Sequence, residues 1–214
     1  MSKILYTSQE NYIKSFRNEI DELIIEMEEF AKKGKVPILT PDSAQFLEQL
    51  ITIHKPKRVL EIGCAIAYST IRIAKNLKKK SVIDTIEVSK ENIKKAKFYI
   101  DKSNVKDKIN IIEGDALEVM PNLSNKYDFI FLDADKEDYE KLFYFSLMLL
   151  KKNGIILVDN LLWHGYAASS KVPPKFRNST KHVRNFNNLF LSHPTLKSTL
   201  LPIGDGLGLG IKIK

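Results

Sequence analysis

Two carboxylates and an amide follow buried strands in this sequence, and together they could bind a divalent cation. Phe129–Leu132 is a run of four apolar residues, typical of a central parallel strand, and Asp133 follows it directly. A later predicted strand, Gly154–Asp159, ends at Asp159 and is followed by Asn160. Because ligands of open α/β sheets bind beyond the carboxyl ends of the strands, these three side chains should meet. Hard oxygen donors with two negative charges favour Mg²⁺.

Glycine and acidic residues stand at the ends of three further predicted strands and indicate a pocket for an adenosine-bearing cofactor. Gly63 allows a close backbone approach, and the helix after it offers N–H groups and a positive dipole end. Glu87 could accept hydrogen bonds from both ribose hydroxyls, and Asp115 and Ala116 would border the base. NAD and S-adenosylmethionine both fit such a pocket. Hydride transfer has no use for the oxygen cluster, so S-adenosylmethionine is favoured.

The elements that would position these residues alternate along the chain. Strands and helices at this spacing predict an α/β fold with a parallel sheet and right-handed crossovers. Gly204–Gly206 joins the last two strands as a hairpin turn, which predicts an antiparallel member at one edge. The expected strands are 58–63, 82–87, 109–114, 127–133, 154–159, 195–203 and 207–214, and the expected helices are 68–77, 90–101, a short one from about 116, 137–150 and 181–191.

A helical N-terminal extension, residues 1–53, is expected to precede the sheet within one domain of residues 1–214. Apolar residues recur at helical spacing across residues 9–33, which predicts one amphipathic helix. Thr40 caps a second helix that runs to about Ile53. The first helix either packs against its own domain or meets a second subunit.

Composition and length indicate a globular chain with a modest excess of positive charge. The 214 residues include 34 Lys and Arg against 26 Asp and Glu, and the net charge of +8 indicates either an anionic partner or a lysine-rich composition. The single cysteine, Cys64, excludes an internal disulfide and a thiolate zinc site. Neither a membrane-spanning apolar run nor a signal-peptide core is visible, so we expect a cytoplasmic protein with no membrane partner.

These motifs resemble those of the metal-dependent O-methyltransferases, the group of catechol and caffeoyl-CoA O-methyltransferases. The matching stretches lie between residues 36 and 213 and include VLEIGCAIAYST, TIEVS, IIEGDALE, YDFIFLDADK and GIILVDNLLWHG. Within this family the sequence is most similar to the bacterial tRNA 5-hydroxyuridine methyltransferases, through VPIL, NFNNLFLSHP and LPIGDGLGL. The resemblance implies a homodimer and a Rossmann-like class I methyltransferase fold. Such a fold has a seven-stranded, mostly parallel sheet with an antiparallel C-terminal hairpin and helices on both faces.

The resemblance also assigns roles to individual residues. Lys136 and Asp133 are the catalytic candidates, with Lys136 as the general base, although a lysine at a helix start can also be merely solvated. Ala67 stands where the family usually has glycine, which should narrow the cofactor turn, and Asp135 is unusual at its position. The implied cofactor contacts are Leu39, Gly63, Ser69, Glu87, Asp115, Ala116 and Asp133, and the implied Mg²⁺ ligands are Asp133, Asp159 and Asn160.

Two substrate classes suit the mechanism that this site implies. Methyl transfer from a sulfonium needs an oxyanion held in line with the S–CH₃ bond, and Mg²⁺ can chelate two adjacent oxygens and acidify one of them. A catechol offers two vicinal hydroxyls. A 5-hydroxyuridine offers its 5-hydroxyl beside its 4-carbonyl, so the same site could serve both.

The segment Asn160–Gly204 bears on the choice between these substrates because it contains no acidic residue. A basic rim suits a phosphate backbone, and an aromatic side chain could stack on an exposed base. We therefore expect methylation of 5-hydroxyuridine at the wobble position, in the anticodon region of tRNA. A small catechol or caffeoyl-CoA-type substrate is the alternative, and a non-catalytic binding module is a third. The candidate RNA contacts are Trp163, Lys175, Arg177, Lys181 and Arg184.

Overall fold

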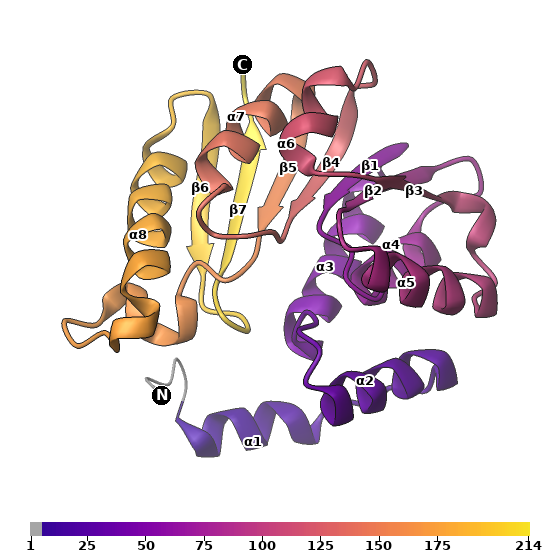
Figure 1. Cartoon of the computed structure of the whole chain (residues 1–214), viewed down its shortest axis with the longest axis horizontal. Coiled ribbons are helices and arrows are strands. Elements are labelled where there is room, and N and C mark those ends of the chain that lie inside the picture. Colours follow the sequence, from indigo (N-terminus) through magenta and orange to yellow (C-terminus); the bar gives the residue numbers. More distant parts are fainter. Residues whose placement is uncertain (1–5) are drawn as a thin grey trace.

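A mixed sheet lies at the centre of the computed structural model, which describes residues 6–214 (Figure 1). Its strands in this part of the chain are β1 (Arg58–Ile62), β2 (Val82–Glu87), β3 (Ile109–Glu113), β4 (Tyr127–Leu132), β5 (Leu150–Val158), β6 (Leu196–Leu201) and β7 (Leu207–Lys212). They are ordered β3-β2-β1-β4-β5-β7-β6. The strands β1 to β5 pair in parallel, whereas β7 is antiparallel to both β5 and β6. The predicted seven-stranded fold with its C-terminal hairpin is therefore confirmed.

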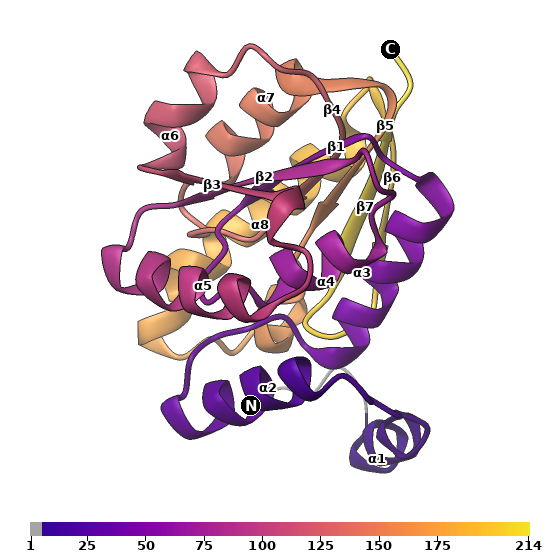
Figure 2. The ribbon, with the colours of Figure 1, turned by 90° about the vertical axis from the view of Figure 1, so that its right-hand side faces the viewer.

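Helices cover both faces of this sheet, and each face has its own hydrophobic core (Figure 2). One core holds α2 (Glu22–Gly34), α3 (Pro41–His54), α4 (Tyr68–Asn76) and α5 (Lys90–Lys102). The other holds α6 (Ala116–Val119), α7 (Tyr139–Leu149) and α8 (Arg177–Ser192). Short 3₁₀ turns complete the connections at η1 (Lys106–Lys108), η2 (Met120–Asn122), η3 (Trp163–Ala168) and η4 (Pro174–Phe176).

The central strand β4 is buried on both sides, as its apolar run predicts. Phe129 and Phe131 belong to one core, and Ile130 and Leu132 belong to the other. Successive side chains of a strand point to opposite faces, so a strand covered by helices on both faces needs an unbroken apolar run. All four side chains are fully buried, which fixes the depth at which the next residue, Asp133, leaves the sheet.

The single helix predicted over residues 9–33 is wrong, because the structure has two helices there. The first is α1 (Thr7–Ser15), and the second, α2, begins after residues 17–21, which are not helical. Asp21 caps α2 by accepting hydrogen bonds from the backbone N–H groups of Leu23 and Ile24. Asp21 has extended rather than helical backbone angles, as expected of such a cap, so the helix is interrupted although the apolar pattern continues.

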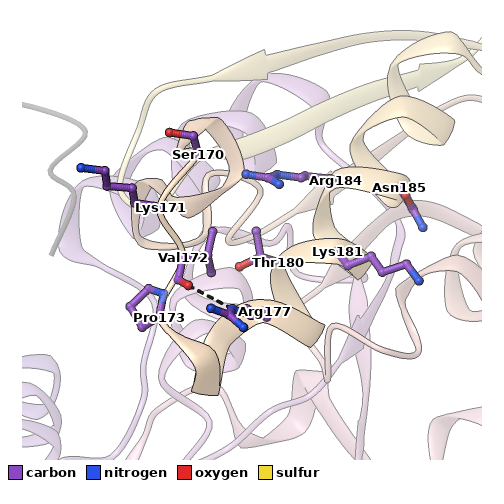
Figure 3. Close-up of a pocket in the computed structure, with 9 residues that line it drawn as sticks. All are labelled: Ser170, Lys171, Val172, Pro173, Arg177, Thr180, Lys181, Arg184 and Asn185. Atoms are coloured by element: carbon purple, nitrogen blue, oxygen red, sulfur yellow. Dashed lines mark hydrogen bonds between the residues drawn. The ribbon is translucent and has the colours of Figure 1, made fainter.

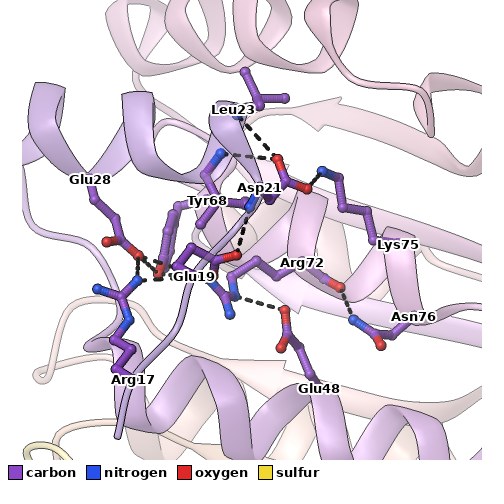
Figure 4. Close-up of polar contacts among 11 residues, drawn as sticks. Arg17, Glu19, Asp21, Leu23, Glu28, Glu48, Tyr68, Arg72, Lys75 and Asn76 are labelled. Carbon is purple, nitrogen blue, oxygen red and sulfur yellow. Dashed lines mark hydrogen bonds and ion pairs between the residues drawn. The ribbon is translucent and has the colours of Figure 1, made fainter. Parts of the chain in front are cut away.

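Acidic and basic side chains hold the non-helical segment against α4 (Figure 4). Arg72 of α4 is almost fully buried, and its Nη1 lies 2.9 Å from Glu19 Oε2 and 3.1 Å from Tyr68 Oη. Its Nε lies 2.8 Å from Glu48 of α3 in an ion pair whose geometry is not that of a hydrogen bond. Lys75 pairs with Asp21. These contacts explain why the chain leaves the helical path before α2.

The first helix, α1, lies outside the two cores and has no buried residue (Figures 1 and 2). Tyr6, Tyr12 and Phe16 are each at least two-thirds exposed. The predicted homodimer and the predicted domain limits remain predictions, and residues 1–5 of the N-terminal extension lie outside the described residues. No helix formed by residues 6–214 has the length and apolar character needed to cross a membrane.

Most other element boundaries agree with the sequence prediction to within a few residues, and the differences have local causes. α8 begins at Arg177 rather than 181, because the Thr180 hydroxyl donates to the Phe176 carbonyl and the helix continues toward its N-terminus. β5 begins at Leu150, which pairs with Tyr127 ahead of a register shift in β4.

Candidate active site

The carboxyl ends of the five parallel strands lie side by side at one edge of the sheet. Backbone hydrogen bonds continue the pairing one residue past each strand. Gly63 N donates to Ile86 O at 3.0 Å, and Gly114 N donates to Glu87 O at 2.9 Å. On the other side, Asp133 N donates to Ile62 O at 3.0 Å, and Asp159 N donates to Leu132 O at 3.1 Å. The predicted cofactor and metal residues at these strand ends are therefore brought together.

Gly63 is required by a close approach of two backbones. Its φ is +90°, and a Cβ built on it would lie 2.1 Å from the carbonyl oxygen of Asp133. A side chain at Gly63 would therefore push β1 and β4 apart at their carboxyl ends. From the sequence we expected a ligand to approach this glycine, whereas in the structure its close neighbour is Asp133.

The loop after β1 adopts left-handed backbone conformations at two alanines, one of which, Ala67, stands where the family usually has glycine. Ala65 has φ +46° and Ala67 has φ +68°. This conformation is unfavourable for residues with a Cβ. Ala67 is buried and stands immediately before α4, so the loop delivers the N-terminus of that helix to the strand ends.

Glu61 organises the same loop from inside the sheet. It is fully buried and accepts hydrogen bonds from the hydroxyls of Ser69, Thr70 and Thr85. Burial raises the pKa of Glu61 to about 7, the three hydroxyls oppose that shift, and the charge of Asp133 adds to it. Because the Ser69 hydroxyl donates its proton to Glu61, Ser69 Oγ could act toward a cofactor only as a hydrogen-bond acceptor.

The other predicted cofactor positions occupy different environments. Glu87 is buried, and its two oxygens accept 2.9 Å hydrogen bonds from the backbone N–H groups of Ala65 and Ser89. Each oxygen retains a lone pair for a ribose hydroxyl. Asp115 is exposed and caps α6 through Leu117 N, while Ala116 is half-buried and Leu39 is buried in the core. Their contacts with a cofactor remain predictions.

Asp159 has the features expected of a metal ligand. It is only 4% exposed, and its Oδ1 is buried without a hydrogen-bond partner. Burial raises the pKa of Asp159 to about 8, and the nearby charge of Asp133 adds to the shift. An unpaired buried carboxylate beside a second carboxylate is unfavourable unless a cation neutralises both. Asp133, Asp159 and Asn160 therefore form an oxygen-rich donor set that fits Mg²⁺.

This donor set contains only two carboxylates, with an amide as its third member. In residues 6–214 no cluster of three or more His, Cys, Asp or Glu side chains could hold a metal. A site of this composition leaves part of the coordination shell of Mg²⁺ to water or substrate oxygens. Asp133 remains partly exposed, with a side-chain exposure of 31%, so the site is open on that side.

Lys136 lies beside this donor set and is nearly buried. Its Nζ donates to Asp133 Oδ1 at 3.4 Å, to the Ala134 carbonyl at 3.0 Å and to Tyr139 Oη. Tyr139 Oη in turn donates to the Asp159 carbonyl at 3.0 Å. Lys136 is therefore not the merely solvated lysine of the alternative interpretation. Asp135, by contrast, is exposed.

Trp163 borders the same region from the loop after β5. The Lys136 Nζ lies 5.8 Å from the centre of its ring, and Trp163 Nε1 is buried without a hydrogen-bond partner. The ring of Phe176 packs edge-on against Trp163 at 6.3 Å. An aromatic wall therefore stands next to the catalytic candidates.

The four basic residues predicted to contact RNA lie around η4 and α8, and three of them line one cavity. This cavity has a volume of about 780 Å³ (Figure 3). Lys181 and Arg177 line it and are exposed. Arg184 also lines it, but its guanidinium donates to the carbonyls of Tyr166, Ala167 and Ser169. Lys175 is exposed beside Phe176 and does not line the cavity, whereas Lys171, which was not among the predicted contacts, does.

Asp205 is a site residue that the sequence analysis missed. It lies in the turn between β6 and β7, and it is close enough to Asp159 to contribute to the raised pKa of that carboxylate. The sequence Gly204-Asp205-Gly206 reads as an ordinary hairpin turn, in which an aspartate is common. The one signal in the sequence is that Asp205 directly follows Asn160–Gly204, the segment without acidic residues.

The fold and the strand-end geometry are those of a Rossmann-like methyltransferase, and comparisons with known proteins agree. The profile of the O-methyltransferase family matches residues 14–213. The caffeoyl-CoA O-methyltransferase of Eucalyptus gunnii is 32% identical over 200 residues, covering 88% of this chain and 80% of the plant protein. The chain therefore belongs to the O-methyltransferase family, which confirms the predicted class of S-adenosylmethionine-dependent O-methyltransferases.

Solved structures show the same similarity in three dimensions. The methyltransferase PaMTH1 from Podospora anserina, bound to S-adenosylhomocysteine (SAH), has a TM-score of 0.86 and 26% identity and covers 97% of this chain and 94% of its own. An O-methyltransferase from Bacillus cereus in complex with SAH has a TM-score of 0.83 and 25% identity, covering 97% of this chain and 98% of that chain.

Proposed function

We propose that this O-methyltransferase methylates one oxygen of a vicinal oxygen pair on a small aromatic molecule. The methyl donor is S-adenosylmethionine, and a divalent cation is held by Asp133, Asp159 and Asn160. The observation that carries the proposal is the buried, unpaired Oδ1 of Asp159 beside a second carboxylate. The relatives named as caffeoyl-CoA O-methyltransferases support a small aromatic substrate over the tRNA favoured by the sequence.

When bound at these residues, a divalent cation would supply Lewis-acid chemistry, lowering the pKa of a substrate hydroxyl that stands beside a second oxygen. Asp133 and Asp159 contribute the negative charge that retains it, and Asn160 contributes a neutral oxygen. Such a site selects substrates with two adjacent oxygens, because a lone hydroxyl offers only one donor. Preference for vicinal oxygen pairs over single hydroxyls therefore distinguishes this activity from the methylation of simple phenols.

Lys136 is the residue placed to take up the proton of the substrate hydroxyl at Nζ. Because Nζ donates to three acceptors in the structure, it would have to give up one of these N–H groups to act as general base. Its contacts with Asp133, the Ala134 carbonyl and Tyr139 keep the amine at the end of β4. Trp163, whose ring centre lies 5.8 Å from Lys136 Nζ, would orient an aromatic substrate by packing against its ring.

The strand ends β1 to β3 would hold the methyl donor. Glu87 retains lone pairs for the ribose hydroxyls, and the hydroxyl of Ser69 is fixed in direction by Glu61. Rigid placement matters because the oxyanion must lie in line with the S–CH₃ bond, and positioning of this kind contributes roughly 7–11 kcal/mol to lowering such barriers.

An acceptor series tests this proposal directly. Labelled S-adenosylmethionine and Mg²⁺ are supplied with a catechol, with a caffeoyl thioester and with the corresponding monohydroxy compounds. We expect methyl transfer to the vicinal diols, little transfer to the monohydroxy compounds and loss of transfer after exhaustive chelation. Equal rates on vicinal and single hydroxyls, or full activity in excess chelator, would contradict the proposal.

The basic cavity supports a second candidate function, methylation of 5-hydroxyuridine in tRNA. Lys171, Arg177 and Lys181 line it and are exposed, and no acidic residue lines it. Such a cavity would suit phosphates, which a tRNA backbone carries. A phosphate-bearing thioester would also suit it, so the cavity alone does not favour tRNA over a small substrate.

A competition assay distinguishes the two candidates. The enzyme is incubated with a caffeoyl thioester and with tRNA that carries 5-hydroxyuridine, at equal acceptor concentrations and for equal times. Each acceptor is supplied alone and then both together. For a small-molecule enzyme we expect turnover of the thioester and no product on tRNA. Methylated tRNA with no product from the thioester would replace the first candidate by the second.

A further inference from the structure

The loop that carries Asn160 and Trp163 adopts an unfavourable backbone conformation. Asn160 has φ +62°, Trp163 has φ +48° and His164 has φ +55°, all in the left-handed region. Residues with side chains hold such angles only where the surrounding structure imposes them. This loop contains one proposed metal ligand and the aromatic wall of the substrate region, so whatever imposes its shape also shapes the site.

The turn between β6 and β7 holds this loop in place. Asp205 Oδ1 accepts a 2.6 Å hydrogen bond from His164 N, and the Asp205 carbonyl accepts one of 2.9 Å from Leu162 N. Leu161 N donates to the Gly206 carbonyl at 2.9 Å. Three backbone N–H groups of the loop thus donate to the two-residue segment 205–206 of the turn.

Gly206 shows how closely the turn and the loop approach each other. Its φ is +88°, and a Cβ built on it would lie 2.5 Å from Leu162 Cγ and 2.7 Å from Leu162 N. No side chain fits between the two segments. The turn is therefore in direct backbone contact with the loop, and Asp205 cannot move away from it freely.

The second oxygen of Asp205 is buried beside the ring of His164, with Oδ2 at 3.7 Å from His164 Nδ1. Among residues 6–214 this Oδ2 has no hydrogen-bond partner, and the side chain is only 13% exposed. Burial raises the pKa of Asp205, while the N–H and ring of His164 and the side chain of Asn160 oppose the shift. The side chain of Asn160 is therefore near enough to this carboxylate to lower the pKa of Asp205.

We propose that Asp205 is a positioning residue that fixes the left-handed conformation of Asn160 and directs its amide oxygen toward Asp159, thereby setting the affinity of the cation site. An amide that offers its nitrogen to Asp205 must turn its oxygen the other way, because the two atoms share one planar group. Groups that hydrogen-bond to a metal-ligating side chain, and so fix its orientation, strongly affect metal affinity. The inference rests on the proposed function, since it needs a cation site at Asp133, Asp159 and Asn160.

The simpler alternative is that Asp205 only joins the C-terminal hairpin to the body of the protein. The two roles differ in what they affect. A structural role would weaken the fold and the cofactor pocket along with the metal site. A positioning role would weaken the metal site alone, and the conservative Asp205→Asn variant would recover part of the loss, because its amide oxygen can still accept from His164 N.

The test measures Mn²⁺ binding, SAH binding without metal and the fluorescence of Trp163, which is the only tryptophan of the chain and lies in the loop itself. The variants are Asp205→Ala, Asp205→Asn and, as a matched control, Asp135→Asn, which removes an exposed carboxylate near the same site. Thermal melts identify any variant that is not folded.

We expect Asp205→Ala to weaken Mn²⁺ binding about tenfold or more. Trp163 emission should change, and SAH affinity should stay within about twofold of the wild type. Asp205→Asn should lose more than twofold in Mn²⁺ affinity but less than Asp205→Ala loses. If Asp205→Ala does not fold, the Mn²⁺ affinity of Asp205→Asn is the result that tests the inference. Asp135→Asn should bind Mn²⁺ within twofold of the wild type.

Less than a twofold loss of Mn²⁺ affinity in Asp205→Asn and less than fivefold in Asp205→Ala would overturn the inference. A parallel loss of SAH binding, or an equal loss in Asp135→Asn, would overturn it too. Failure of the wild type itself to bind Mn²⁺ would instead overturn the proposed function.

Discussion

At the scale of single residues, the site is a row of acids with unequal burial. Glu61 and Asp159 are almost completely buried, whereas Asp133 between them is partly exposed. Burial raises the pKa of both buried acids, and Asp133 adds to each shift. Asp133 is therefore the electrostatic link between the cofactor side and the metal side of the site.

Glu61 should make the stability of the protein depend on pH. Its pKa in the folded state is about 7, above the ordinary value of 4.5, so the folded protein retains a proton that the unfolded chain releases. The contribution of Glu61 is therefore fully present below about pH 4.5 and is lost as the pH rises through about 7. We expect the Tm to fall from about pH 5 to about pH 8, and to fall less in Glu61→Gln.

Thermal melts of the metal-free protein across this pH range provide the measurement. Because other groups also titrate, the quantity of interest is the difference between wild type and Glu61→Gln at each pH. An identical pH profile in the two proteins would show that Glu61 does not carry the raised pKa.

At the scale of elements, the connection from β1 to α4 determines how the cofactor side is shaped. Ala67 holds φ +68° in a buried position where glycine would be unstrained. A left-handed alanine costs about 1–2 kcal/mol, and glycine gives back about 0.4–1 kcal/mol through the greater freedom of the unfolded chain. We expect Ala67→Gly to stabilise the fold by up to about 1 kcal/mol, raising the Tm by roughly 2–4 °C.

Ala96→Gly is the matched control for this change. Ala96 is also fully buried, but it lies inside α5, where glycine costs about 1 kcal/mol. Chemical denaturation of both variants should therefore give shifts of opposite sign. A loss of stability in Ala67→Gly comparable to that in Ala96→Gly would contradict the strain assigned to Ala67.

The strands and their ends could be predicted from sequence because the signals are local. The apolar run Phe129–Leu132 must be buried on both faces, and parallel strands between helices bring their carboxyl ends to one edge. Residues such as Asp133, Asp159 and Glu87 followed from this rule alone. Their neighbourhood is confirmed by the backbone pairing that continues past each strand.

The break before α2 and the role of Asp205 could not be predicted because both depend on contacts distant in sequence. Glu19 meets Arg72 across 53 residues, and His164 meets Asp205 across 41. In the sequence, the first segment shows only helical periodicity and the second shows only a hairpin turn. Neither pattern contains information about its partner.

Arg72 should be one of the main anchors of the N-terminal segment. Its side chain is 7% exposed and contacts Glu19, Glu48 and Tyr68. Arg72→Ala would leave these groups without their buried partner, so we expect a loss of about 3 kcal/mol and a Tm lowered by roughly 6–12 °C. Arg17→Ala, which removes a more exposed cation, should cost at most about 1 kcal/mol. Equal losses in the two variants would contradict the anchoring role.

At the scale of the whole molecule, the acids of the candidate site and the basic cavity occupy different parts of the fold. The acids of the candidate site stand at the carboxyl ends of the strands, and the cavity of Lys171, Arg177 and Lys181 lies at the N-terminal part of α8 and the loop before it (Figures 1 and 3). Such a separation would let one substrate place its reacting oxygens at the acids and a phosphate-bearing portion at the cavity.

Reversing the charge of the cavity should therefore affect only substrates that carry phosphate. For Lys171→Glu combined with Lys181→Glu, we expect KM for a caffeoyl thioester of coenzyme A to rise about tenfold, with kcat/KM for free catechol within about twofold of the wild type. Steady-state kinetics at low and high salt measure both values. An equal effect on the two acceptors would show that the cavity does not contact the substrate.

The central claim is that Asp159 holds the cation on which methyl transfer depends. The most direct measurement is the initial rate of labelled methyl transfer from S-adenosylmethionine to a vicinal diol, for wild type, Asp159→Asn and the exposed control Asp135→Asn. We predict that Asp159→Asn lowers the rate by about 100-fold or more, equivalent to about 2.7 kcal/mol, and that excess chelator does the same to the wild type. Asp135→Asn should retain nearly full activity. A wild-type rate from Asp159→Asn would contradict the account.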